Sequence, residues 1–289
     1  MQKNIIKLEH PRNHHMVGDG FRVTNYIPGY SSEMSNDTSP FLMLDYNAPW
    51  SISPQWTHRP WVGFHPHRGF ETVTIVYSGE LEHQDTAGHG GVIWVDEVQW
   101  MTAGSGLLHN EFMTAEFSRM GGIQHAVQLW VNLPAKDKMT TPRYQALTRQ
   151  NIPEILFDGG RARVIAWELD GIRWVAETFS PVELYDIRFD TVGQFSFSLP
   201  EMHTTMILVT EWEVTINTKL VKNGDMIHLS HIWTDISIQA DITAKVLVMS
   251  WKPLWETIAH YGPFVMNTQE EIIQAFADLN AWRMGNIEL

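Results

Sequence analysis

Short strands separated by turn residues dominate the sequence from about Phe41 onward, and this pattern constrains the fold more than any other feature. The segment AVQLWVNLP, residues 126–134, places Val, Leu, Val and Leu on one side of a strand and Gln, Trp and Asn on the other. ETVTIVYSGE, residues 71–80, is rich in β-branched residues and ends at a glycine turn. Many short strands with frequent turn signals are typical of a sandwich or barrel, so we predict an all-β fold.

The chain is long enough for one large domain or two medium domains. Residues 133–147, LPAKDKMTTPRYQAL, interrupt the strand pattern with charges and two prolines, and a second strand-rich stretch follows. We therefore predict an N-terminal barrel over residues 1–135, a linker over 136–148 and a C-terminal barrel over 149–289. The two halves could be copies of one module, although their sequence similarity is too weak to prove it.

Only the C-terminus has a clear helical pattern. Thr268 and Glu271 have the spacing of a capping box, and Ile272, Phe276 and Leu279 then recur at helical spacing. We predict a C-terminal helix that packs its apolar stripe against a barrel.

Composition excludes several functions. The formal net charge is −13 and lysines and arginines do not cluster, which disfavours direct nucleic-acid binding. The chain has no cysteine, so a metal site would need His, Asp or Glu ligands. The N-terminus lacks the apolar region of a signal peptide, and no apolar run is long enough to span a membrane. We expect a soluble cytoplasmic protein, with a monomer as the default.

Two pairs of candidate metal ligands stand out in the N-terminal half. His65 and His67 lie two residues apart in an extended segment, so both can point to the same face. Taken alone, this pair could also be two surface histidines beside a proline turn. His109 and Glu111 form a second such pair after a glycine-rich turn. On adjacent strands inside a barrel, the two pairs would present three imidazoles and a carboxylate to one divalent ion with positions left open.

At these motifs the chain resembles the pirin family of the cupin superfamily. HPHRGFETVT, QWMTAGSGLLHNE, QLWVNLP and HYGPFVMNTQEEI all read as pirin segments, and they extend over most of the chain. The general cupin motifs fit less well, because Ala103 and Gly104 stand where the second motif has Pro-x-Gly.

The resemblance implies a bicupin fold, with two β-barrels face to face and a metal in the N-terminal barrel only. It assigns the metal ligands to the two histidines of HPH and to the later H-x-E, which are His65, His67, His109 and Glu111. Fe(II) is the expected cofactor, and Ni, Cu, Co, Mn and Zn are possible. Glu71 matches a cupin ligand position that pirins do not use, and we expect it to be a hydrogen-bonded strand carboxylate.

The second half departs from the metal-binding pattern. When its strand text is aligned with the first half, Ser198 and Pro200 replace the two histidines of HPH. His203, His228 and His231 are scattered, and we interpret them as structural or surface groups. We therefore expect no metal in the second barrel.

Other polar groups near the first motif allow two interpretations. His83, Asp85 and His89 lie in a hairpin, where such residues are usually solvated, although one of them could lie at the mouth of the barrel. His125 begins an apolar strand and is expected in the core.

The resemblance implies a quercetin 2,3-dioxygenase activity that splits flavonols with O2. Glu111 would accept the proton of the flavonol 3-hydroxyl, whose pKa a bound metal lowers. A flat polyphenol requires an apolar cavity, and four large apolar side chains near the ligands could line it or belong to the core: Phe64, Trp100, Met101 and Phe112.

Two other functions are compatible with the same residues. One is a non-enzymatic iron-binding module that docks on a partner protein, either in transcriptional co-regulation or on an enzyme. The other is an oxygenase with a different substrate, since a fold does not fix its chemistry. An open route to the metal would favour catalysis, and a sealed metal would favour the regulatory module.

Overall fold

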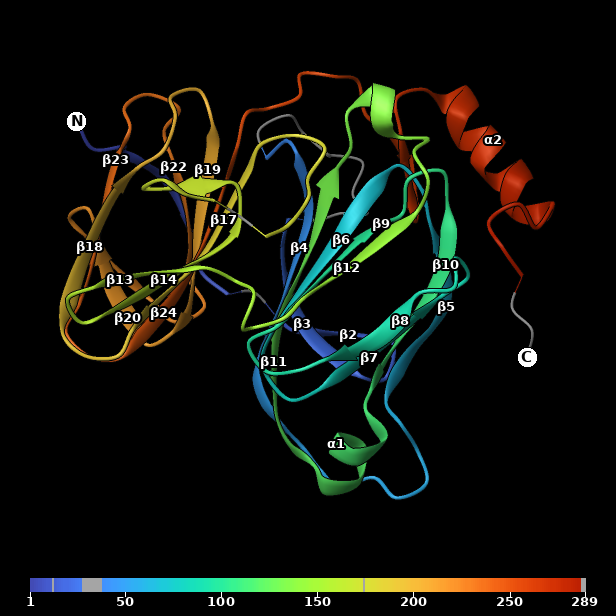
Figure 1. The fold of residues 1–289 in the computed structure, drawn as a ribbon, viewed down its shortest axis with the longest axis horizontal. Coiled ribbons are helices and arrows are strands. Elements are labelled where there is room, and N and C mark those ends of the chain that lie inside the picture. Colours follow the sequence, from blue (N-terminus) through green and yellow to red (C-terminus); the bar gives the residue numbers. More distant parts are fainter. Residues whose placement is uncertain (12, 28–37, 174, 287–289) are drawn as a thin grey trace. The chain divides into compact units, whose positions relative to one another are not determined.

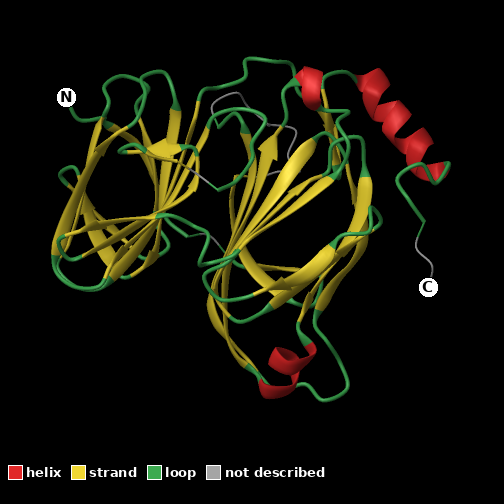
Figure 2. Ribbon diagram, in the orientation of Figure 1, coloured by secondary structure: helices red, strands yellow, loops and turns green. Residues whose placement is uncertain are grey.

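A computed structural model describes residues 1–11, 13–27, 38–173 and 175–286, and the chain divides into two compact units. The first barrel comprises Asn13–Ser35, Pro40–Arg149 and Leu254–Leu289, and the second barrel comprises Met1–Arg12, Asn36–Ser39 and Gln150–Pro253. Strands make up most of each unit, which confirms the all-β prediction (Figures 1 and 2).

The first barrel contains a larger and a smaller antiparallel sheet and a short hairpin. The larger sheet has seven strands, in the order β12 (Arg143–Leu147), β9 (Val98–Thr102), β6 (Phe70–Ser78), β11 (Gly122–Asn132), β4 (Phe41–Ile52), β3 (Phe21–Ile27) and β2 (His15–Val17). The smaller sheet has the order β5 (Trp61–His67), β10 (Leu107–Met113), β7 (Leu81–Asp85) and β8 (Gly90–Ile93). The remaining elements are the hairpin β25 (Ala259–Tyr261) and β26 (Phe264–Met266), helices α1 (Ala115–Met120) and α2 (Gln269–Asn280), and a 3-10 turn (Ala135–Asp137).

The second barrel repeats this plan of a seven-stranded and a four-stranded sheet. The larger sheet has the order β1 (Ile5–Glu9), β22 (Met226–Leu229), β19 (Thr204–Glu211), β24 (Ala244–Trp251), β17 (Val182–Phe189), β14 (Gly160–Ala166) and β13 (Glu154–Phe157). The smaller sheet has the order β18 (Gly193–Ser198), β23 (Asp235–Ala240), β20 (Glu213–Ile216) and β21 (Lys219–Lys222). The hairpin β15 (Glu168–Leu169) and β16 (Ile172–Arg173) completes the unit.

The unit boundaries differ from the predicted ones in three places. The predicted linker, 136–148, contains β12, which pairs with β9 in the first barrel. Strand β1 pairs with β22, so the start of the chain belongs to the second barrel. Residues 254–289 belong to the first barrel. The physical reason is that sheet edges take up backbone hydrogen bonds from segments far away in sequence, and no local pattern encodes that pairing.

Helix α2 begins at the predicted capping box. The Thr268 hydroxyl accepts the Glu271 amide at 3.2 Å, and the Glu271 carboxylate accepts the Thr268 amide at 3.0 Å. Ile272 is buried in a cluster with residues of the first barrel, as the apolar stripe predicts. A buried ion pair between Arg68 and Asp278, at 2.9 Å, also holds the helix. None of the helices among the described residues has the length and apolar character needed to cross a membrane.

Both barrels bury apolar side chains together with some polar ones. A large apolar cluster in the second barrel includes Tyr185, Ile187 and Ile207 from its central strands. The central strands of the first barrel carry buried polar side chains, among them Glu71 and Gln99, so its interior can hold a polar site.

Candidate metal centre

The two predicted ligand pairs lie on neighbouring strands. Strands β5 and β10 are antiparallel partners, and His65 lies directly opposite His109. The turn before β10 depends on Gly104, which has a φ of +51° and where a Cβ would lie 2.2 Å from the Thr140 carbonyl oxygen. The turn and the strand register together bring three histidines from two sequence motifs to one place.

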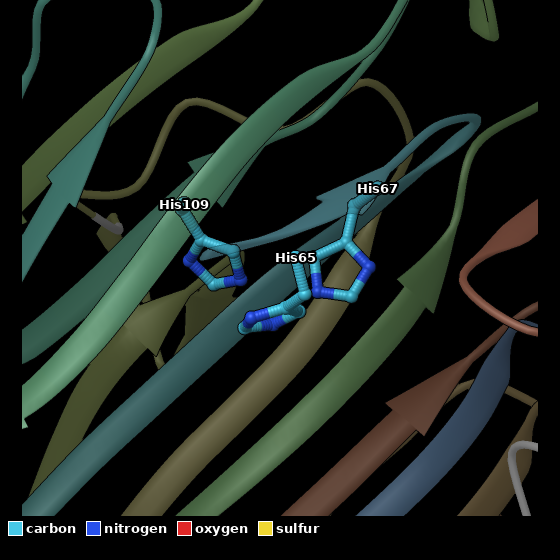
Figure 3. A group of neighbouring side chains, drawn as sticks. All are labelled: His65, His67 and His109. Atoms are coloured by element: carbon cyan, nitrogen blue, oxygen red, sulfur yellow. The ribbon is translucent and has the colours of Figure 1, made fainter. Parts of the chain in front are cut away.

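The three imidazoles of His65, His67 and His109 face one another (Figure 3). Their ring centroids lie 4.3 to 4.8 Å apart, and one ligand atom from each ring lies within 4.8 Å of the others. The Nδ1 atom of His65 is 2.8 Å from the Gly63 carbonyl oxygen, which leaves Nε2 for a metal. The Nε2 atom of His109 is buried with no hydrogen-bond partner among the described residues, as expected for an atom that binds an ion. This donor set suits a divalent transition metal.

Burial keeps two of these histidines neutral. Loss of water and the charge of His65 hold the pKa values of His67 and His109 well below their usual range. Neutral imidazole is the form that binds a metal, so the protein already carries these two ligands in the required state at neutral pH.

Glu111 lies on β10, two residues after His109, but outside the three-histidine group. A register irregularity in β10 follows His109, and Glu111 then lies opposite Val62. The Glu111 carboxylate is buried, and its Oε1 accepts a hydrogen bond from Nε2 of Gln128 at 2.8 Å. Because Glu111 does not join the histidine group in this structure, its ligation remains a prediction.

A small cavity lies beside Glu111. Its volume is about 40 Å³, which is room for a water molecule or a diatomic molecule. Its lining combines apolar side chains with five polar ones: Asp45, Asn47, Thr74, Glu111 and Gln128. The four large apolar residues that the sequence suggested for a cavity are absent from this lining. Trp100 and Met101 are fully buried, and Phe112 stacks on Trp61 with ring centroids 5.5 Å apart.

The hairpin residues His83 and Asp85 are buried, so their interpretation as solvated turn groups is wrong. Both lie on β7, where Glu111 pairs with His83 and His109 pairs with Asp85 across the sheet. The Nδ1 atoms of His83 and His109 are 3.3 Å apart, and Nε2 of His83 is 3.3 Å from Oδ2 of Asp85. His89, which is partly exposed, places Nδ1 3.2 Å from the same carboxylate oxygen.

Two further groups complete the surroundings of His83. The Nε2 atom of Gln99 lies 3.0 Å from Nδ1 of His83, and the Tyr144 ring stacks on the His83 ring at 5.0 Å. Burial opposes ionisation of Asp85, but its hydrogen bonds with His83 and His89 lower its pKa overall. Asp85 is therefore a carboxylate at neutral pH.

The sequence did not identify the residues of β11 that approach the centre. Trp130 packs edge-on against His67, with ring centroids 5.1 Å apart, and Gln128 bonds Glu111. Both side chains lie on the face of β11 opposite its Val and Leu residues. Alternation did not reveal that most side chains on both faces of β11 are buried and that Gln128 is half-buried.

Two other predictions about polar residues agree with the structure. Glu71 is fully buried on β6, and its Oε1 accepts a hydrogen bond from the Thr102 hydroxyl at 2.7 Å. Burial raises its pKa to about 7. His125 is buried in the core, where its ring contacts those of Tyr46 and Tyr77.

Two of the three histidines that the sequence analysis named in the second half, His203 and His228, pair with carboxylates on strands of the second barrel. His203 lies 3.1 Å from Glu183, and His228 lies 2.7 Å from Glu9. Among the described residues, the one group with metal-ligand geometry is in the first barrel. Absence of metal from the second barrel remains a prediction.

Comparison with known proteins gives matches along nearly the whole chain. The family model named Pirin matches residues 20–131, and the model of the pirin C-terminal cupin domain matches residues 184–285. A Pseudomonas aeruginosa protein named provisionally as a quercetin 2,3-dioxygenase is 41% identical, over 97% of this chain and 98% of its own length. Pirin-1 of Arabidopsis thaliana is 34% identical, over 99% of this chain and 94% of its own. The crystal structure of quercetin 2,3-dioxygenase from Acinetobacter baumannii superposes with a TM-score of 0.93 at 43% identity, covering 99% of this chain and 100% of that chain.

Proposed function

This chain belongs to the pirin family, and from that premise we propose that it is a metal-dependent dioxygenase that cleaves flavonols such as quercetin with O2. The observation that carries the proposal is the group of His65, His67 and His109, the last two of them buried, in a chain that is 43% identical to a quercetin 2,3-dioxygenase of known structure. The substrates would be a small polyphenol and O2.

We propose Fe(II) as the resident metal, although the same donors accept Ni, Cu, Co, Mn or Zn. His65, His67 and His109 would hold it, and Glu111 would join them as a fourth ligand. A bound divalent metal would supply the Lewis acidity that lowers the pKa of the flavonol 3-hydroxyl.

Glu111 is the residue we propose as the general base. It lies on β10, two residues after His109, and lines a small cavity in the first barrel. We propose that it accepts the hydroxyl proton of the substrate. The hydrogen bond from Gln128 fixes the orientation of its carboxylate, and burial excludes most water from it. The base is therefore held in place before the substrate arrives, which reduces the entropy cost of the proton transfer.

The size of the cavity favours a second candidate function. A pocket that buries a drug-sized molecule measures about 300–1,000 Å³, whereas the cavity beside Glu111 measures about 40 Å³. This cavity is too small to hold a flavonol. A regulatory module that docks on a partner protein needs no substrate cavity, so we keep it as the alternative function.

Turnover by the metal-loaded protein separates the two functions. The protein is reconstituted with Fe(II) without air, and quercetin and air-saturated buffer are then added while O2 uptake and flavonol absorbance are recorded. Glu111→Gln is expected to retain little activity. Glu71→Gln is the matched control, because it removes another buried carboxyl of the same barrel. Metal binding without turnover of quercetin or related flavonols would overturn the dioxygenase proposal and favour the regulatory module.

A further inference from the structure

We propose that Asp85 and His83 set the tautomer of His109 and so prepare its Nε2 atom for a metal. This inference rests on the metal centre of the proposed function but not on its substrate. Asp85 and His83 are positioning residues, since neither belongs to the three-histidine group.

Two backbone hydrogen bonds fix the orientation of the Asp85 carboxylate. Its Oδ1 accepts the backbone N–H groups of Ala87 at 2.9 Å and His89 at 3.0 Å. Its Oδ2 is thereby directed at the side chains of His83 and His89. An ionised carboxylate can only accept, so the Nε2 atom of His83 must carry a proton and donate it to Oδ2.

The proton on Nε2 determines the rest of the chain of hydrogen bonds. The Nε2 atom of Gln99 lies 3.0 Å from Nδ1 of His83 and can only donate, so Nδ1 of His83 must accept. The other group within reach of it is Nδ1 of His109, at 3.3 Å. An unprotonated Nδ1 on His109 would bring two nitrogen lone pairs face to face at 3.3 Å, which is repulsive. We infer that His109 carries its proton on Nδ1, shared with the acceptor on His83, and that its lone pair is on Nε2.

The predicted lone pair lies where a metal would need it. Nε2 of His109 is buried and has no hydrogen-bond partner in the part of the chain that the structure describes. The ring faces His65 and His67, which supply the other donors (Figure 3). Partners that fix the tautomer and orientation of a ligand histidine typically change metal affinity by about 10- to 100-fold when they are removed.

Substitution of Asp85 by Asn should reverse the tautomers. The amide oxygen of the variant would stay at the Oδ1 position, because the two backbone N–H groups require an acceptor there. The amide nitrogen would then donate to Nε2 of His83, and the His83 proton would move to Nδ1. The Gln99 amide, which now donates to that Nδ1, would have to turn over and present its oxygen. His109 would have to accept at Nδ1 and carry its proton on Nε2, the atom that faces the other two rings.

The first measurement uses metal-free protein, so turnover plays no part in it. Histidine ring nitrogens are labelled with 15N, and long-range proton–nitrogen correlations identify the tautomer of His109, whose signals are assigned with His109→Gln. We expect the proton on Nδ1 in the wild type and on Nε2 in Asp85→Asn. The same tautomer in both proteins would overturn the inference.

The second measurement is affinity for Ni(II) alone, in competition with a chromophoric chelator. His83→Phe keeps a ring for Tyr144 to stack on but removes the acceptor, and it should bind Ni(II) about 10- to 100-fold more weakly. His83→Gln can still accept from His109 and donate to Asp85, so it should recover most of the affinity. His125→Phe is the control for loss of a buried imidazole elsewhere in the barrel.

The outcomes distinguish this inference from the proposed function. If the wild type binds Ni(II) tightly but the Fe(II)-loaded protein does not turn over quercetin, the dioxygenase proposal is refuted and the tautomer argument stays intact. Unchanged Ni(II) affinity in both His83→Phe and Asp85→Asn would refute the tautomer argument, whatever the turnover.

Discussion

Glu71 should make the first barrel less stable as the pH rises through neutrality. Its side chain is fully buried on β6. Burial is the main cause that raises its pKa from 4.5 to about 7, against the opposing effects of the hydrogen bonds from Thr102 and Trp100 and of the Arg143 charge. The pKa is higher in the folded chain than in the unfolded one. The contribution of Glu71 to the free energy of unfolding is therefore fully present below pH 4.5 and is lost as the pH rises through 7.

The shift gives the magnitude of the effect. Each tenfold change in proton affinity is worth about 1.4 kcal/mol, so a rise from 4.5 to about 7 corresponds to about 3 kcal/mol. Glu71→Gln can still accept the hydrogen bond from Thr102 and carries no charge at any pH. The variant should gain up to about 3 kcal/mol of unfolding free energy relative to the wild type between pH 5 and pH 8.

Urea denaturation at pH 5, 6, 7 and 8, with a chelator present to remove metal, measures this difference. Exposed Glu213→Gln is the control for the loss of one acidic group without loss of a buried one. A difference between Glu71→Gln and the wild type that stays constant from pH 5 to pH 8 would refute the reasoning, because the penalty for the buried charge must grow as Glu71 ionises.

Three further changes test other parts of the first barrel. Lys138→Met removes three buried hydrogen bonds of 2.6 to 2.9 Å, and urea denaturation should show a loss of about 3 kcal/mol or more. Asp278→Ala leaves the buried Arg68 guanidinium without the carboxylate that lies 2.9 Å from it, and we expect the free energy of unfolding to fall by about 3 kcal/mol. Amide exchange in α2 should become faster, and unchanged exchange would contradict a role of this ion pair in holding the helix. His65→Ala should abolish Ni(II) binding in the chelator competition but leave the urea midpoint of the metal-free protein unchanged, because apolar burial supplies most of the stability; an unfolded variant would show that the site is structural.

Local sequence spacing was sufficient to predict the parts of the site and fold that depend on a single segment. Two residues of spacing in an extended strand put His65 and His67 on one face, and the capping box fixed the start of α2. The grouping of His109 with them also agreed, because β5 and β10 are neighbours. Here the resemblance to a family supplied the pairing of the strands, which spacing alone does not give.

Features that depend on pairing between distant strands could not be predicted. The hairpin that contains His83 and Asp85 has the composition of a solvated turn, and only the register of β7 against β10 places both side chains beside the histidines. Strands β1 and β12 complete sheets at positions remote in sequence. In each case the local residues allow several partners, and the backbone hydrogen bonds of the assembled sheet decide between them.

Strand β11 shows why alternation alone identifies a core but not a site. A strand with one face in water and a strand with one face in a polar interior both alternate apolar with polar residues. In β11 most side chains of both faces are buried and Gln128 is half-buried, so Gln128 bonds Glu111 and Trp130 packs on His67. Burial of a polar side requires partners for its polar groups, and in this barrel those partners include the candidate base and a metal ligand. A polar residue on a strand whose two faces are both largely buried is therefore a stronger indicator of a functional site than its residue type alone.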